Sequence, residues 1–323
     1  MQEKLLPGIA GVSLTCKLPA ISSWLMALDE WGTKGVDVSQ RKLCSDRKMN
    51  DKMNADNRNS HGEDFDLDWH DDHVVPPFMF PDLEFFFARL SEATFDAVSP
   101  HNGERVLDVG CGRANDAMDL ARRGGTCLGL EPSETMIYHA KRDIAKNGNG
   151  VALLRGIGED IPLKTHSVDK VVCKGALDHF PTPEKAIIEM ARVVKPGGSV
   201  IITVANLDCL GFRLGRTFFV RFRKMLRRKE SIYEKIWQTP FDHTYRFDYK
   251  TLNKMVKRHM KVDDSIGVSL FFASPWWGSI LHRLPRPLSR GILRMLDAIA
   301  RHVPSLSDGV VLKCSLRADG KAQ

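Results

Sequence analysis

Several features that would assign this 323-residue chain to a common class are missing from its sequence. No apolar run reaches the ~18 residues that a membrane-spanning helix needs. The seven cysteines form no C-x-x-C pair and no cluster with histidine at zinc-ligand spacing. The apolar stretch 5–16 is interrupted by Pro7, and no clear small-residue cleavage site follows it. These absences argue against membrane-spanning, metal-binding and secreted proteins, and we expect a cytoplasmic protein with reduced thiols.

The composition is that of a globular protein with a sizeable core, since 43% of the residues are hydrophobic and 27% are charged. Residues 41–64 are polar, rich in Asn and poor in core-forming side chains, which predicts a flexible linker. We therefore expect an N-terminal extension over 1–75 and one domain over 76–323. Trp69 and His70 restore aromatic character after the linker, either as a surface docking arm or as a lid over a ligand.

The stretch 105–114, with the sequence RVLDVGCGRA, combines a short apolar strand, a glycine turn and the start of a helix. Such a turn places a ligand at a helix N-terminus, although an ordinary strand-to-helix connection has the same outline. Dinucleotide sites use G-x-G-x-x-G, and Asn115 occupies the position of the third glycine. Asp108 would repel a pyrophosphate but would accept hydrogen bonds from a cationic amino-acid group. The pattern therefore argues against NAD.

Apolar β-type segments alternate with helical patterns after this turn, which predicts a parallel sheet covered by helices. We expect strands at 106–109, 126–131, 151–155, 167–173, 199–204, 262–272 and 309–316. We expect helices at 83–97, 249–259 and 288–299, the first of them capped by Asp82.

Glu131 ends the second predicted strand, 23 positions after Asp108. Acids at about this spacing bind ribose hydroxyls in nucleotide sites. Ser133 follows as the N-cap of the next helix, with Met136 at its third position.

Residues 105–204 resemble the core of class I S-adenosylmethionine (SAM)-dependent methyltransferases, in the style of the small-molecule enzymes of ubiquinone and menaquinone biosynthesis. The matching phrases, in order, are VLDVGCG, the acid in LGLEPS, GEDIPL, SVDKVV, LDHF and MARVVKPGG. The resemblance implies an α/β fold, a Rossmann-like doubly wound, mostly parallel seven-stranded sheet with an antiparallel last strand between the fifth and sixth. Helical inserts are then expected at about 207–240 and 274–305.

The resemblance also implies S-adenosyl-L-methionine as cofactor and no metal. By analogy, Asp108 and the turn at 110–114 hold the methionyl part, Glu131 the ribose, and Gly158-Glu159 the adenine edge. The expected cofactor-binding set is Asp108, Gly110, Cys111, Gly112, Ala114, Glu131, Pro132, Met136, Gly158, Glu159 and Lys174. Members of this style often carry Asp where this chain has Ile157, so adenine recognition would fall to Glu159 or to backbone groups.

The implied reaction is in-line transfer of a methyl group to a nucleophile, which depends mainly on positioning and on exclusion of water. A general base is needed only for a hydroxyl or an acidic carbon. The candidates are His179, which follows the fourth strand, and His243, which lies beside Asp242. For each of them a purely structural role is at least as consistent with the sequence as a role as general base.

The C-terminal third of the sequence predicts that the molecule receiving the methyl group, the acceptor, is apolar or amphiphilic. Residues 216–228 form a basic amphipathic helix pattern, within a stretch, 211–261, that holds fifteen Lys/Arg and four Asp/Glu. Such a helix is typical either of a lid that packs on the domain or of a contact with an anionic membrane. Trp276 and Trp277 add a second apolar element. The alternatives are an RNA methyltransferase using the basic segment, although no RNA-binding module is recognisable, and a noncatalytic SAM-binding protein.

Overall fold

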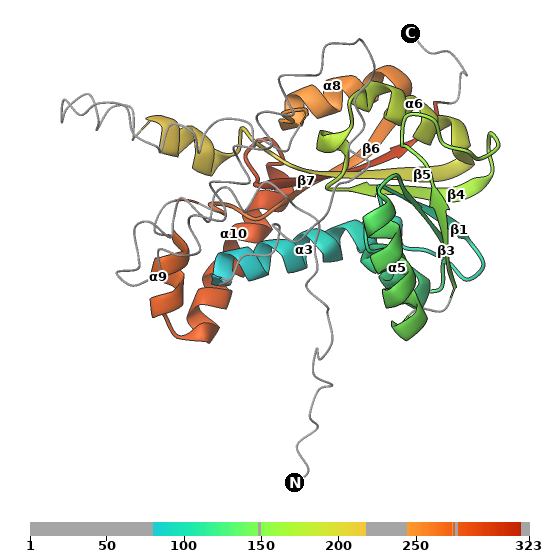
Figure 1. Cartoon of the computed structure of the whole chain (residues 1–323). Coiled ribbons are helices and arrows are strands. Elements are labelled where there is room, and N and C mark those ends of the chain that lie inside the picture. The colour runs from blue at the N-terminus through green and yellow to red at the C-terminus, as the bar shows by residue number, and fades with distance from the viewer. Residues whose placement is uncertain (1–79, 148–149, 218–243, 273, 275–276, 318–323) are drawn as a thin grey trace, which may run out of the picture.

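The structure is a computed structural model, and it describes residues 80–147, 150–217, 244–272, 274 and 277–317 (Figure 1). Some sequence expectations fall outside these residues. They are the linker at 41–64, the lid interpretation of Trp69 and His70, most of the 216–228 helix, and the residues His243 and Trp276.

The described part of the chain is built on one seven-stranded sheet with the order β3-β2-β1-β4-β5-β7-β6. The pairs among β1 to β5 are parallel, whereas β7 runs antiparallel to both of its neighbours, β5 and β6. The strands are β1 (Arg105–Val109), β2 (Thr126–Glu131), β3 (Val151–Arg155), β4 (Val168–Lys174), β5 (Val194–Ala205), β6 (Lys261–Val268) and β7 (Gly309–Ser315). The predicted α/β, doubly wound sheet with an antiparallel last strand is confirmed.

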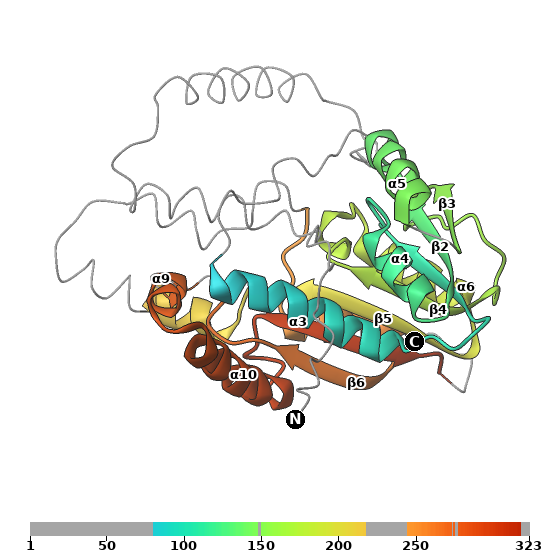
Figure 2. The same ribbon diagram turned by 90° about the horizontal axis from the view of Figure 1, so that it is seen from below.

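Helices cover both faces of this sheet (Figures 1 and 2). One face carries α3 (Pro81–Val98), α4 (Asn115–Arg122), α5 (Glu134–Asn147) and α10 (Arg286–His302). The other carries α6 (Pro183–Val193) and α8 (Tyr249–His259). The short helix α9 (Trp277–Arg283) packs against α3, and residues 210–217 are helical.

Two hydrophobic cores explain why the strand segments read as continuous apolar runs. Leu107 and Val109 of β1 join the core on the side of α6 and α8, whereas Val106 joins the core on the side of α3 and α4. Successive residues of a strand point to opposite faces, and both faces of this sheet are buried. A buried parallel strand therefore shows no alternation of polar and apolar residues.

Several predicted boundaries are wrong, among them the start of the fifth strand, which is Val194 and not residue 199. Asp82 does not cap α3, because the helix begins at Pro81 and Phe80 takes the capping position. Proline suits a first helical turn, where its fixed φ is helical and no N–H is needed. The sixth strand ends at Val268 and not at 272, since Ser269 and Phe271 have φ values of 59° and 67°, which break an extended chain.

Candidate cofactor site

The turn after β1 is tightly wound and bound to the neighbouring strand. The backbone N–H groups of Gly110 and Cys111 both donate to the carbonyl of Leu130 in β2, at 2.9 Å each. Gly110, Gly112 and Ala114 have φ values of 70°, 51° and 59°. These left-handed conformations suit glycine and cost an alanine about 1 kcal/mol, so Ala114 is held there by its surroundings. The turn is pre-formed in the protein itself.

Glu131 ends β2, as the sequence predicted, and its carboxylate faces this turn. Its Oε2 atom accepts a hydrogen bond from the N–H of Gly112 at 2.7 Å, and Oε1 accepts one from the N–H of Ser133 at 3.1 Å. The residue is buried at 6% exposure. Ser133 Oγ in turn accepts from the N–H of Met136 at 3.2 Å, which fulfils the predicted N-cap of α5. The carboxylate is thus fixed between the glycine turn and the next helix.

The ring of Phe180 links two glycine positions that are far apart in sequence, a role that sequence reasoning missed. A Cβ atom on Gly158 would lie 2.6 Å from Cε2 of Phe180, and one on Gly110 would lie 2.6 Å from Cβ of Ala176 and 3.6 Å from the Phe180 ring. Both close approaches require glycine. The LDHF phrase therefore supplies the ring against which the loop after β3 and the turn after β1 both pack.

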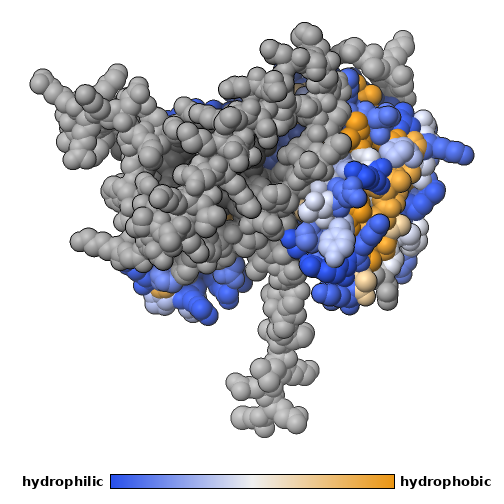
Figure 3. Space-filling model, viewed as in Figure 1, coloured by the Kyte–Doolittle hydropathy of each residue, from blue (hydrophilic) through white to orange (hydrophobic). Residues whose placement is uncertain are grey.

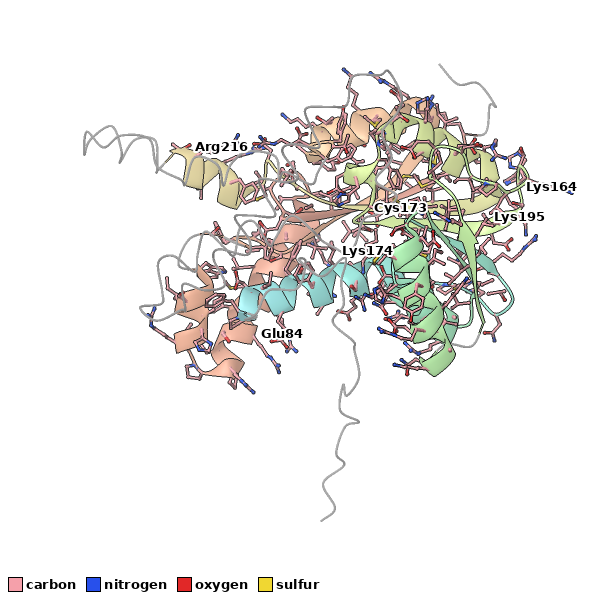
Figure 4. The ribbon with its side chains drawn as sticks, viewed as in Figure 1. Glu84, Lys164, Cys173, Lys174, Lys195 and Arg216 are labelled. Atoms are coloured by element: carbon pink, nitrogen blue, oxygen red, sulfur yellow. The ribbon has the colours of Figure 1, made fainter. Side chains whose placement is uncertain are left out.

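Lys174, at the end of β4, forms its interactions with side chains of α3 and α4. Its Nζ atom donates to Oδ1 of Asp116 and to Oγ of Ser91, both at 2.8 Å, and lies 5.5 Å from the centre of the Phe95 ring. Figure 4 shows it in the interior between the sheet and α3, whereas Arg216 lies on the helical segment at the edge of the molecule. These contacts support a role in positioning α4, the helix that follows the glycine turn.

Two residues of α6 hydrogen-bond to the loop after β3. Glu189 accepts the N–H of Ile161 at 2.9 Å, and Arg192 donates to the carbonyls of Ile161 and Leu163, both at 2.8 Å. The ion pair with Arg192 lowers the pKa of the Glu189 carboxyl. Arg192, in the phrase MARVVKPGG, therefore helps to hold the phrase GEDIPL in place. Glu159 of this loop accepts from the N–H of Thr182 at 3.2 Å.

The described segment that begins at Thr244 is hydrogen-bonded to the segment that carries His179. The N–H groups of Thr244 and Tyr245 both donate to the carbonyl of Asp178, at 3.0 and 2.9 Å. The hydroxyl of Thr244 donates to the carbonyl of His179 at 3.3 Å. The chain directly after His243 is therefore bonded to the short helix η2 (Leu177–His179), which contains the other candidate.

A buried polar cluster at the ends of β5, β6 and β7 was not predicted. Oδ2 of Asp308 accepts the N–H of Phe272 at 2.8 Å, and its own N–H donates to the carbonyl of Ser269. Burial, with the charge of Asp82 nearby, raises the pKa of Asp308 to about 7. Burial next to Asp308 also raises the pKa of the Cys209 thiol well above its usual range. No local sequence signal marks this cluster, since its members come from distant segments.

The residues of this site fit SAM. Two carboxylates, Asp108 at 2% and Glu131 at 6% exposure, stand at the ends of adjacent strands. Acceptor groups of this kind suit an ammonium group and a ribose diol, whereas a pyrophosphate would be repelled. Among the described residues no group of three or more His, Cys, Asp or Glu side chains is arranged to hold a metal ion.

The sheet order with an antiparallel β7, together with an acid-bearing glycine turn after β1 and an acid after β2, is the architecture of class I SAM-dependent methyltransferases. Residues 107–202 match the family model described as a methyltransferase domain. The solved structure of the PH0226 protein from Pyrococcus horikoshii OT3 has the same fold, with a TM-score of 0.50 and 14% identity, over 77% of this chain and 100% of that one.

Within this class the chain resembles ubiquinone biosynthesis O-methyltransferases. It is 33% identical to the enzyme of Paracidovorax citrulli over 144 residues, which is 41% of this chain and 59% of that enzyme. It is 35% identical to the enzyme of Citrobacter koseri over 105 residues, which is 32% of this chain and 43% of that enzyme. The chain thus matches about half the length of these relatives.

Proposed function

We propose that the protein is a SAM-dependent methyltransferase that methylates an oxygen or carbon of a small, apolar or amphiphilic acceptor. The observation that carries the proposal is the buried Glu131 carboxylate bonded to Gly112 in the turn after β1. The similarity to enzymes named for ubiquinone biosynthesis supports O-methylation and an apolar acceptor.

In this proposal each residue has a physical task. When bound, SAM supplies a methyl group on a positively charged sulfur. Asp108 and the turn at 110–114 orient the amino-acid end of the cofactor, and Glu131 accepts hydrogen bonds from the ribose. Gly158 and Glu159 border the adenine, with Ile157 packing on the ring. An acceptor hydroxyl loses its proton as the new bond forms, and His179 or His243 takes that proton.

The proposal extends to where the enzyme works. An acceptor of this kind partitions into lipid, so we propose a cytoplasmic protein in peripheral contact with an anionic membrane. No helix among the described residues has the length and apolar character to cross a bilayer. The basic stretch 211–261 would favour such a surface through its cations.

The test has two parts. Calorimetry should show binding of SAM and of its demethylated product, S-adenosylhomocysteine, and none of NAD. Labelled SAM is then incubated with the protein and a cell extract that is fractionated into lipid, small-molecule, RNA and protein pools. Label should enter the lipid or apolar small-molecule pool. Label confined to RNA would replace the proposal with an RNA methyltransferase, and binding of NAD alone would overturn the cofactor.

A further inference from the structure

The connection between β6 and β7, residues 269–308, is held closed where it leaves and rejoins the sheet. The N–H of Asp308 donates to the carbonyl of Ser269 at 3.1 Å, and Oδ2 of its side chain accepts the N–H of Phe272 at 2.8 Å. The carbonyl of Asp308 also accepts the N–H of Asn206, the residue after β5, at 2.8 Å. One residue at the returning end therefore holds both the outgoing end and the neighbouring strand.

The outgoing end has a strained backbone. Ser269 and Phe271 have φ values of 59° and 67°, which are unfavourable for residues with a Cβ and persist only where the surroundings hold them. The N–H of Ser269 donates to Oδ1 of Asp297 on α10 at 3.1 Å, and Asp308 holds the other side. Figure 3 shows a mostly hydrophilic surface where the described residues of the α9–α10 end are visible, which agrees with a connection held from its inner side. Weaker contacts with Asp308 would let this backbone relax.

The side chain that makes these contacts is a buried acid near a second buried acid. Asp308 is 3% exposed, and Asp82 of α3 is 4% exposed. Among the described residues, no cation forms an ion pair with Asp308. Burial and the charge of Asp82 both disfavour the ionised form, and they raise the pKa of Asp308 to about 7. The folded protein therefore keeps this carboxyl protonated in mild acid and ionises it near neutral pH.

The elements packed around Asp308 supply few other titratable groups. The thiol of Cys209, after β5, lies beside the carboxyl, and its own pKa is raised by burial. Asp297 of α10 is paired with Arg89 of α3, and His282 of α9 packs edge-on against the ring at the start of α3. The charge that acts on the carboxyl is thus that of Asp82.

We propose that Asp308 is a proton-controlled latch, whose neutral carboxyl holds residues 269–272 against the sheet and whose ionisation releases them. An ionised carboxylate that stays buried near Asp82 without a cation is unfavourable, so an opening that hydrates it is favoured. Residues 206 and 269 follow the carboxyl ends of β5 and β6, the edge at which ligands bind in such sheets. Opening therefore widens the approach to this edge. Its consequence for an acceptor rests on the proposed function, whereas the latch itself does not.

The test is hydrogen exchange of the whole protein between about pH 5 and pH 8, read by mass spectrometry and corrected for the intrinsic pH dependence of amide exchange. Opening of residues 269–272 should increase by up to about tenfold per pH unit up to about pH 7 and then level off, because the closed state binds the proton more tightly than the open state. The amides of β1 should be better protected at every pH. Asp308→Asn stays neutral and can still accept the N–H of Phe272, so opening in this variant should not depend on pH.

A matched pair of variants on α3 tests the neighbouring charge and leaves Asp308 in place. Asp82→Asn removes the charge near the carboxyl, so the increase in opening should level off at a lower pH. Glu84→Gln neutralises an exposed acid in the same first turn of α3 and should behave like the native protein. No pH dependence in the native protein, native dependence in Asp308→Asn, or equal protection of 269–272 and β1 at every pH would each overturn the proposal. The measurement uses neither SAM nor an acceptor, so failure of the latch and failure of the proposed enzyme activity are distinguishable.

Discussion

The Nζ atom of Lys174 lies 2.8 Å from Oδ1 of Asp116, and this pair ties the first turn of α4 to the end of the central strand β4. The lysine side chain is 2% exposed and the aspartate side chain 14%. Both charges are therefore largely removed from water and depend on each other. The pair sits directly behind the glycine turn, so its geometry bears on the cofactor site.

Removing Lys174 should both destabilise the protein and weaken SAM binding. Lys174→Met leaves Asp116 without its cation, and a loss of about 3 kcal/mol in the free energy of unfolding is expected. Lys195→Met breaks a pair with Asp169 whose side chains are 34% and 25% exposed, and should cost less than about 1 kcal/mol. Urea denaturation and SAM calorimetry of both variants test this. Equal losses would show that burial of the Lys174 pair has no energetic consequence.

Glu131 should contribute strongly to cofactor affinity. In the proposed complex its carboxylate accepts charge-assisted hydrogen bonds from the ribose, so Glu131→Ala should weaken SAM binding at least about tenfold. Glu131→Gln keeps an acceptor oxygen for the N–H of Gly112 but loses the charge, and should give an intermediate affinity. Calorimetry with SAM measures both. A well-folded Glu131→Ala protein with native affinity would remove Glu131 from the site.

The contact between Gly158 and Phe180 predicts a steric loss of stability that a second substitution can relieve. Gly158→Ala places a methyl group 2.6 Å from the ring and should cost about 1–3 kcal/mol of stability. Adding Phe180→Leu should recover part of that loss, because the smaller side chain frees the space. Gly291→Ala is the control, since a Cβ there meets nothing within 4 Å. Thermal unfolding of the single and double variants checks the prediction, which additive losses would contradict.

Asp308 should make the stability of the protein depend on pH. Its pKa is raised from 3.8 to about 7, so the folded state holds this proton more tightly than the unfolded chain. This contribution is complete below about pH 4 and is lost as the pH rises to about 7. The groups around the carboxyl are Cys209, Ser269 and the Phe272 N–H, with Asp82 of α3 as the nearby charge. Asp308→Asn should flatten urea-denaturation stability between pH 5 and 7 relative to the native protein. An unchanged slope would refute the assignment.

The sequence was most informative where structure follows from neighbouring residues. Strands β2 and β3 and helix α8 have the bounds predicted for them, because periodicity and turn residues are local signals. The acid at 131 was found from its distance to Asp108, and the structure bonds it to Gly112.

The remaining features depend on residues distant in sequence. Phe180 reaches Gly158 only when β4 lies beside β1, and β6 ends where Asp308, forty positions after Val268, binds the N–H of Phe272. No window of the sequence contains both partners of such a contact. The burial of Asp82 has the same origin, since it arises from the packing of α9 on α3.

The antiparallel pairing of Val268 with Gly309 closes residues 269–308 into an excursion that leaves and re-enters the sheet at one point. The entropy of closing such a loop grows by only about 0.6 kcal/mol for each doubling of its length. The excursion can therefore be lengthened, shortened or exchanged between relatives while β1, β2 and β3 keep their register. A change of length within 269–308 should therefore leave intact the half of the domain that carries the glycine turn.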